Sequence, residues 1–311
     1  MHPLLKSHLA LFVLNLMYGA NYVVAKGLMP NVIGPNGFIF LRIIGATVLF
    51  WIVFSTQFEK VKRKDIIRLA VCAIFGVTVN QLFFFNGLMR TSPVNASVIM
   101  TTTPILVFIL SLLILKEKPE LLKIIGLLIG ATGSIIFTLQ GSSNGDSSLI
   151  GDLFIFVNAA SYALYMVLVK PLMAKYKPLT VITWVFTFGS IYVALWPMST
   201  IEFAQTEFSA LSTDSIIRLV FVVLCVTFLP YLLTVYAMKR LSPSVSSTYI
   251  YLQPLLAAFF IYLFWLFGLE DYTRDFSLGK ILSALLVFVG VYLVIRPKKS
   301  LIDKYDVESQ R

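Results

Sequence analysis

The chain has 311 residues, of which 58% are hydrophobic and 13% are charged, and its formal net charge is +10. Soluble globular domains contain about 25% charged residues, so this composition excludes a soluble globular protein. The basic residues fall in short segments between apolar runs rather than on one basic domain, so we expect no nucleic-acid partner.

Apolar runs of about 20 residues recur along the whole chain, which is the length that an α-helix needs to cross a bilayer. We predict an all-α membrane protein with ten transmembrane helices, surrounded by the lipid bilayer and joined by short connections. The first run is too long for a signal peptide and lacks a clear cleavage site. The predicted helices cover residues 8–28, 35–56, 66–88, 93–115, 121–140, 149–170, 178–197, 215–238, 243–267 and 277–296.

Basic residues gather in alternate connections. Segments 60–68 and 170–177 are rich in Lys and Arg, whereas 141–148 and 198–215 contain neither. Positive residues flank transmembrane helices mainly on the cytoplasmic side. The pattern predicts that both termini are cytoplasmic (N-in/C-in), in a multi-pass protein of the cell (inner) membrane.

The chain contains an internal duplication. Residues Ile66–Leu69 recur as Ile216–Leu219, and the two copies stay in register, 150 positions apart, as far as Pro104 and Pro254. Each half holds five predicted helices, and an odd number means that the second half enters the membrane from the opposite side. We therefore predict two inverted five-helix repeats. The first covers residues 1–140 and the second 149–296, followed by a basic cytoplasmic tail at 297–311.

An ordered set of short motifs accompanies this duplication. The motifs are Phe40–Arg42, Gly87–Pro93, Thr101–Pro104 and Leu115–Glu117, with Gly126 and Gly133. With this set the sequence resembles the EamA-type transporters of the drug/metabolite transporter superfamily. The resemblance implies a permease of small metabolites, often an exporter, with a central cavity lined mainly by helices 1, 3, 4, 6, 8 and 9. Two departures are Tyr18-Gly19, where the family often has Trp-Gly, and Phe186, near the place where the first half has Arg42.

Chemically reactive groups are scarce in the predicted helices. The only histidines are His2 and His8, and no Asp or Glu lies deep in a predicted span. A metal site or an acid–base pair within the membrane would lack its ligands, so we expect no metal, no cofactor and no enzymatic activity. The same absence disfavours coupling to protons through an intramembrane acid.

Arg42 lies about seven residues inside the second predicted helix. A charge there must face protein, water or substrate. One interpretation is a docking point for a substrate carboxylate or phosphate, and the other is a structural bond to helix ends or backbone carbonyls. Lys26 and Lys170, at equivalent places in the two halves, are either snorkelling anchors or gate residues.

Pro104 and Pro254 lie near the middle of two equivalent helices. Proline cannot donate to the carbonyl four residues earlier, so it would free those of Met100 and Ile250. The prolines are either hinges beside the transport site or harmless packing kinks. The polar neighbours that we assign to substrate binding are Thr101, Tyr251 and Gln253.

Polar residues also form one-sided stripes in the first and sixth helices and a cluster in the third and eighth. Amides are unfavourable in lipid, so these faces should point into the bundle, where they either bond neighbouring helices or line a cavity. We assign all of them to a substrate site. They are Asn15, Tyr18, Tyr22, Asn80, Gln81, Asn158, Ser161, Tyr162, Tyr165 and Tyr231, together with Arg42.

We predict a transporter of a small-molecule substrate such as an amino acid, exported by alternating access. One alternative is an exchanger of phosphorylated metabolites or nucleotide sugars, which needs several basic groups in the cavity. Another is a non-transporting membrane scaffold, which needs no cavity. The sequence predicts no particular oligomeric state.

Overall fold

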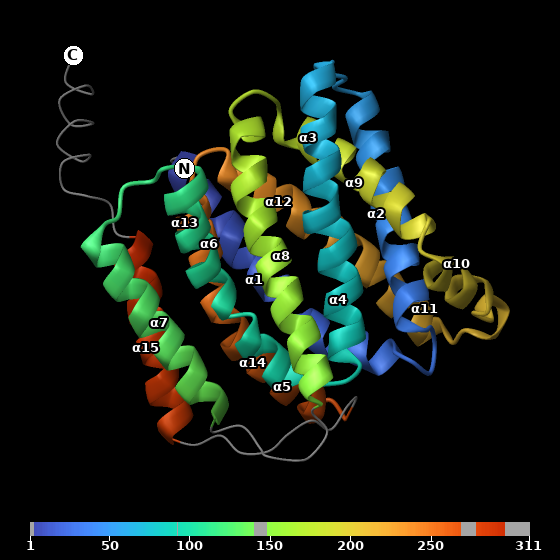
Figure 1. Cartoon of the computed structure of the whole chain (residues 1–311). Coiled ribbons are helices and arrows are strands. Elements are labelled where there is room, and N and C mark those ends of the chain that lie inside the picture. Colours follow the sequence, from blue (N-terminus) through green and yellow to red (C-terminus); the bar gives the residue numbers. More distant parts are fainter. Residues whose placement is uncertain (1–2, 92, 140–147, 269–277, 296–311) are drawn as a thin grey trace.

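The computed structural model describes residues 3–91, 93–139, 148–268 and 278–295, and all of the secondary structure in these ranges is helical, as predicted (Figure 1). Six of these helices are long and apolar enough to cross a membrane, or seven if a pair bent by 79° counts as one span. The chain is therefore a multi-pass membrane protein. The uninterrupted helices are α1 (Pro3–Leu28), α2 (Pro35–Ser55), α7 (Leu121–Leu139), α8 (Leu149–Met173), α9 (Pro178–Ala194) and α15 (Leu278–Ile295).

Four further helical segments are interrupted in the interior. Two of them contain a π-helical turn at the same place of the duplicated sequence, and two break near the predicted prolines. The first two are α3 (Arg63–Ala73), η1 (Ile74–Thr78) and α4 (Val79–Leu88), and α11 (Thr213–Phe221), η3 (Val222–Phe228) and α12 (Leu229–Met238). The other two are α5 (Pro93–Ile99) and α6 (Thr102–Ile114), and α13 (Pro243–Thr248), η4 (Tyr249–Leu252) and α14 (Gln253–Leu266).

A short helix that the sequence did not predict follows α9. Pro197 opens α10 (Pro197–Ala204), which turns by 79° from α9 and packs against α2. A 3-10 turn, η2 (Phe208–Ala210), leads on to α11. The sequence predicts residues 198–215 as a connection between two helices. Proline suits the first turn of a helix, because the missing N–H has no intrahelical partner there.

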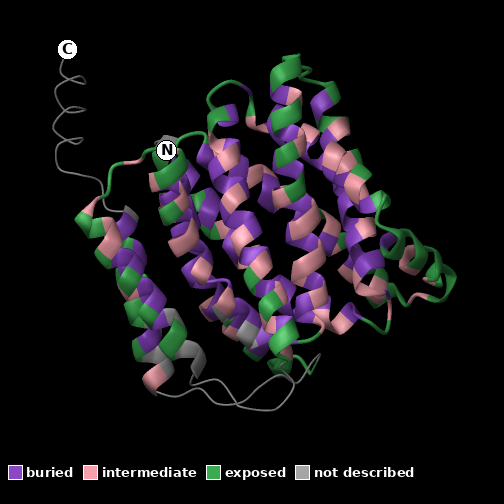
Figure 2. Ribbon diagram, viewed as in Figure 1, coloured by how far each residue is buried: buried purple, intermediate pink, exposed green. Residues whose placement is uncertain are grey.

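Helices from the two halves pack against each other throughout the bundle. α1 contacts α12 and α14, α4 contacts α8, and α2 contacts α9. α7 and α15 form a close pair at one edge, while α2, α3, α9 and α10 form the other edge (Figure 1). Buried residues face the centre and exposed apolar residues face outward (Figure 2), as expected for a bundle in lipid.

The N-termini of α2 and α9 each receive a carboxylate from the other half. Glu202 accepts hydrogen bonds from the backbone of Asn36 (2.7 Å) and Gly37 (3.1 Å). Glu59 accepts from the backbone of Lys177 (3.0 Å) and from the hydroxyl of Thr180. Both acids satisfy free N–H groups and complement the positive end of a helix dipole. These reciprocal caps join the two halves at opposite ends of the bundle.

The α7–α15 pair depends on glycine. A Cβ added at Gly290 would lie 2.5 Å from the backbone nitrogen of Gly130 and 2.7 Å from the carbonyl oxygen of Gly126. Backbone atoms cannot move aside as a flexible side chain can. The two helices therefore reach this distance only without a side chain at Gly290, a mode of packing common among membrane helices.

We expect Gly290→Ala to reduce stability by about 1–3 kcal/mol, the usual effect of overpacking, and to lower the midpoint of thermal unfolding in detergent. Leu282→Ala on the same helix is the control, because Leu282 is 55% exposed and changes a lipid-facing position. Equal midpoints for the two variants would contradict the close helix contact.

Candidate functional site

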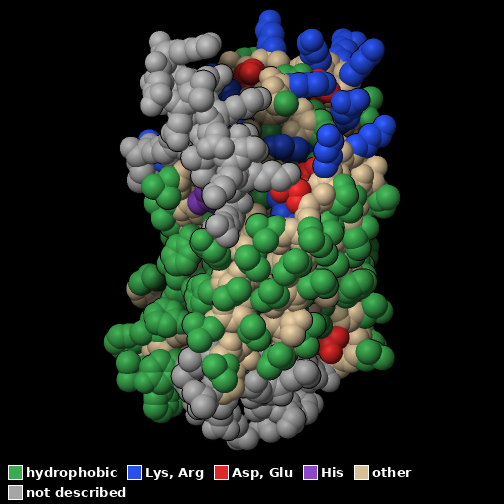
Figure 3. Space-filling view, turned by 90° about the vertical axis from the view of Figure 1, so that its left-hand side faces the viewer, with side chains coloured by type: hydrophobic (Ala, Val, Ile, Leu, Met, Phe, Trp, Pro, Cys, Tyr) green, Lys and Arg blue, Asp and Glu red, His purple; other side chains and the backbone are tan. Residues whose placement is uncertain are grey.

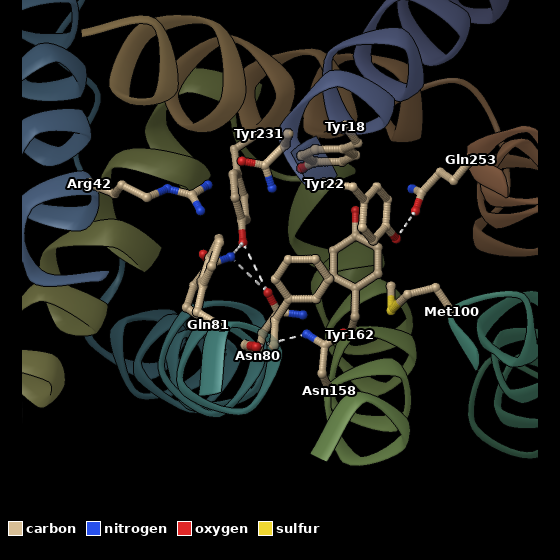
Figure 4. Close-up of a pocket in the computed structure, with 13 residues that line it drawn as sticks. Tyr18, Tyr22, Arg42, Asn80, Gln81, Met100, Asn158, Tyr162, Tyr231 and Gln253 are labelled. Carbon is tan, nitrogen blue, oxygen red and sulfur yellow. Dashed lines mark hydrogen bonds between the residues drawn. The ribbon is translucent and has the colours of Figure 1, made fainter. Parts of the chain in front are cut away.

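A cavity of about 60 Å³ lies between the two halves of the chain (Figure 4). α1 and α4 contribute most of the first-half wall, and α8, α12 and α14 contribute the second-half wall. The wall is a mixture of amides, aromatic rings and one cation. The lining residues are Tyr18, Asn21, Tyr22, Arg42, Asn80, Gln81, Phe84, Phe85, Met100, Asn158, Tyr162, Tyr231 and Gln253.

Nine of the predicted binding residues line this cavity, and five lie elsewhere. Asn15 lines a smaller neighbouring cavity, and Thr101 is buried between α5 and α6. Ser161 donates to the Phe75 carbonyl at 2.7 Å. Tyr165 is fully buried, and the hydroxyl of Tyr251 donates to the Leu127 carbonyl at 3.1 Å. These last three side chains therefore hold helices together, or fill the core, rather than face the cavity.

The sequence did not predict four of the lining residues, which are Asn21, Phe84, Phe85 and Met100. Asn21 lies three residues after Tyr18, so the helical spacing of the first stripe already contained it. Phe84 follows Gln81 at the same spacing. The sequence could not single out the two phenylalanines, because the chain contains 26 of them and most phenylalanines of a membrane protein face lipid or the core.

Arg42 belongs to α2 and is 2% exposed, and its side chain reaches the η3 turn. Its Nε donates to Thr227 Oγ1 at 2.9 Å, and its Nη2 donates to the Val226 carbonyl at 3.4 Å. The guanidinium carbon lies 4.4 Å from the centre of the Phe85 ring, a cation–π contact. The side chain is therefore bonded to another helix, as the structural interpretation requires. It also lines the cavity (Figure 4), so the docking interpretation stays a prediction.

The centre of the cavity wall joins equivalent positions of the two halves. Gln81 Nε2 donates to the Tyr231 hydroxyl at 2.7 Å, and these residues are 150 positions apart, the spacing of the duplication. That hydroxyl in turn donates to the Gly76 carbonyl at 3.0 Å in the η1 turn. Nearby, Asn158 Nδ2 donates to the Asn80 carbonyl at 2.7 Å. α4, α8 and α12 are thus linked by side chains that also face the cavity.

On the opposite wall, Gln253 links two residues of α1. Its Oε1 accepts from the Tyr22 hydroxyl and its Nε2 donates to Asn15 Oδ1, each at 2.9 Å. The bonds engage both the oxygen and the nitrogen of the Gln253 amide, so its orientation in this wall is fixed.

Several buried polar atoms of the cavity wall have no hydrogen-bond partner in the described part of the chain. One is a donor, Nη1 of Arg42, and three are amide oxygens, those of Asn21, Gln81 and Asn158. An unpaired buried polar group costs about 1–3 kcal/mol, and a charged one costs more. An anionic group would match the guanidinium nitrogen, and a hydrogen-bond donor would match the amide oxygens.

Lys26 and Lys170 each cap the C-terminal end of a helix by donating to backbone carbonyls. Lys26 Nζ donates to the carbonyls of Leu88 (3.2 Å) and Thr91 (2.6 Å), beyond α4. Lys170 Nζ donates to the carbonyls of Met238 and Leu241, beyond α12. The four carbonyls match in pairs at a spacing of 150, so both halves use the same cationic cap.

The two prolines lie in the first turns of α6 and α14. Here the prediction of free carbonyls was wrong. The Met100 carbonyl accepts the backbone N–H of Thr103 at 3.0 Å, and the Ile250 carbonyl accepts that of Gln253. Tighter i→i+3 bonds replace those that the prolines remove. The breaks are thus ordered, and Pro104 and Pro254 remain hinge candidates only by their position.

The sequence model of the EamA-like transporter family matches residues 5–139 and again residues 149–296. The chain belongs to this family. Among curated relatives of the EamA-like chain, an uncharacterized transporter of Archaeoglobus fulgidus is 24% identical, with 93% of this chain and 96% of the relative covered. A WAT1-related protein of Arabidopsis thaliana is 22% identical, with 94% and 86% covered. A solved crystal structure with 16% identity has the same fold, at a TM-score of 0.71 over 93% of this chain and 96% of the other.

Family membership confirms the resemblance of the motifs and places the chain among membrane transporters. Within the described ranges, no group of three or more His, Cys, Asp or Glu side chains lies close enough together to hold a metal ion.

We expect Lys170→Met to reduce stability by about 1–3 kcal/mol, because two carbonyls at the end of α12 lose their donor. Thermal unfolding in detergent measures this. Lys239→Met is the matched control: it removes an exposed charge at the same helix end. A loss as large in the control would assign the effect to charge and contradict the capping role.

Proposed function

We propose that the protein carries a small zwitterionic metabolite of the amino-acid class across the cell (inner) membrane. The cavity between the two halves supports this most directly. Its wall presents one guanidinium nitrogen and three amide oxygens that lack partners among the described residues. A substrate carboxylate fits the guanidinium, and an ammonium group fits the amide oxygens. Phe84, Phe85 and Met100 suit an apolar side chain.

We further propose ten transmembrane helices in two inverted five-helix repeats, with both termini in the cytoplasm. The double match to one family model supports the repeat, as do the cationic caps at equivalent helix ends. Lys and Arg side chains gather at the upper end of the molecule in Figure 3, the end near the N-terminus in Figure 1. The positive-inside rule makes this end cytoplasmic.

Transport would proceed by alternating access, with the two halves rocking about the cavity and the substrate leaving the cell. No carboxylate or histidine occurs among the thirteen lining residues, so the wall offers no group that would exchange a proton near neutral pH. We therefore propose facilitated diffusion, or exchange driven by the substrate gradient.

The exchange of phosphorylated metabolites or nucleotide sugars has weaker support. A phosphate carries nearly two negative charges and is bound by several basic groups in the usual case. Arg42 is the one cation among the thirteen lining residues. A non-transporting scaffold needs no polar cavity between the two halves, so the cavity favours a transporter.

Uptake of labelled neutral amino acids into proteoliposomes tests the proposal. We expect saturable uptake that does not depend on a pH gradient, and we expect Arg42→Ala to raise the apparent KM about tenfold or more. A charge-assisted hydrogen bond contributes about 1.5–3 kcal/mol, which corresponds to this factor. Arg68→Ala is the control, because that arginine side chain on α3 is 62% exposed and does not line the cavity. Uptake that requires a proton gradient, or is indifferent to Arg42, would contradict the mechanism.

The orientation has its own test. In a background without Cys72 and Cys225, single cysteines replace Lys60 and Ser209, which are both exposed. A membrane-impermeant maleimide should label the Ser209→Cys protein in intact cells, and the Lys60→Cys protein only after lysis. The reverse pattern would invert the proposed topology.

A further inference from the structure

The unpaired nitrogen of Arg42 has a defined place only because the rest of the guanidinium is held. Arg42 has a long side chain with several rotatable bonds, and a free guanidinium would leave a carboxylate to order it on binding. Its holder is the η3 turn of the other half, through Thr227 and the Val226 carbonyl. The inference below rests on the proposed function, because it concerns how the same site selects a carboxylate.

The η3 turn has an acceptor to spare for a local reason. In an α-helix the carbonyl of Val226 would accept the N–H of residue 230, but residue 230 is proline and has none. The Val226 carbonyl instead accepts Arg42 Nη2. Arg42 therefore bonds a carbonyl whose α-helical donor is missing.

The side chain of Thr227 is itself fixed by a hydrogen bond and by burial. Its hydroxyl donates to the Val222 carbonyl five residues earlier, at 2.9 Å, which is the spacing of a π-turn. With its hydrogen used there, the oxygen presents a lone pair to Arg42 Nε at 2.9 Å. Thr227 is 1% exposed, so water does not compete for this bond.

The first half contains the same turn without a cation. Val79 N–H bonds Ile74 O in η1, as Leu229 N–H bonds Leu224 O in η3, again 150 positions apart. Thr78 Oγ1 likewise lies 3.4 Å from the carbonyl five residues before it, that of Ala73. In η1, however, the carbonyls of Phe75 and Gly76 accept hydrogen bonds from the neutral side chains of Ser161 and Tyr231. Thr78 lies one position beyond Val77, the residue that matches Thr227, and it serves as a control threonine in a π-turn without an arginine.

We propose that Thr227 is a positioning residue for substrate selection: it fixes Arg42 so that Nη1 meets the substrate carboxylate. Thr227 does not line the cavity, so it acts on the substrate only through Arg42. Without its hydroxyl, the guanidinium can rotate to bond other acceptors of the wall, such as the unpaired oxygen of Gln81. The site would then lose its preference for a carboxylate more than its affinity for other ligands.

The test compares L-leucine with L-leucinamide, which lacks the carboxylate, as ligands of the purified full-length protein. The ratio of their dissociation constants is the readout. A general loss of folded protein lowers both signals and leaves this ratio unchanged. In the wild type we expect leucine to bind about tenfold or more tightly than the amide.

We expect Thr227→Val, which keeps the side-chain volume, to reduce this ratio at least fivefold. Thr227→Ser should retain the ratio because it keeps the hydroxyl, and Thr78→Val should retain it because η1 holds no arginine. A ratio unchanged in Thr227→Val, with discrimination intact in the wild type, would overturn the positioning role alone. A wild type that binds neither ligand, or both equally, would overturn the proposed carboxylate site and this inference with it.

Discussion

Every backbone carbonyl inside an apolar bundle needs a donor, and the interrupted helices of this protein leave several without one. Side chains from other helices supply the missing bonds. Ser161 donates to the Phe75 carbonyl, and Tyr231 donates to that of Gly76, both in the η1 turn. Arg42 donates to Val226 in the η3 turn. Many polar side chains of the interior therefore serve to bond backbone carbonyls of the interrupted helices.

This constraint separates two kinds of polar residue that look alike in the sequence. Ser161 and Tyr251 each donate to a backbone carbonyl, whereas Asn21 and Gln81 line the cavity and have an unpaired side-chain oxygen. The first kind sets the spacing of the helices. The second kind, together with Arg42, leaves buried polar atoms in the cavity wall that a polar ligand would hydrogen-bond. The same buried network thus supports both the shape of the cavity and its proposed selectivity.

The duplication repeats the structural devices but not the charge. Both halves have a π-turn, a lysine cap and a carboxylate at a helix N-terminus. Phe186 stands where the repeat would place a second Arg42, and its ring lies 4.8 Å from that of Tyr231. An aromatic ring stands where a second cation would lie, so Arg42 is the one cation among the residues that line the cavity. A single positive charge suits a ligand with one carboxylate better than one with a phosphate.

The sequence by itself determined the helical class, the approximate helix boundaries, the family and the residue types of the interior. Hydrophobic length and ordered motifs are local properties, so they can be recognised without coordinates. Only the tertiary structure decided which polar residues face the cavity. Tyr162 and Tyr165 are three positions apart on one helical stripe, yet the first lines the cavity and the second lies in the core. Their neighbours on other helices make that difference, as they do for Arg42, whose partner Thr227 lies 185 positions away. The sequence did not predict the π-turns either, because they lie in continuous apolar runs where a shift of one residue in the helical period has no polar residues to reveal it.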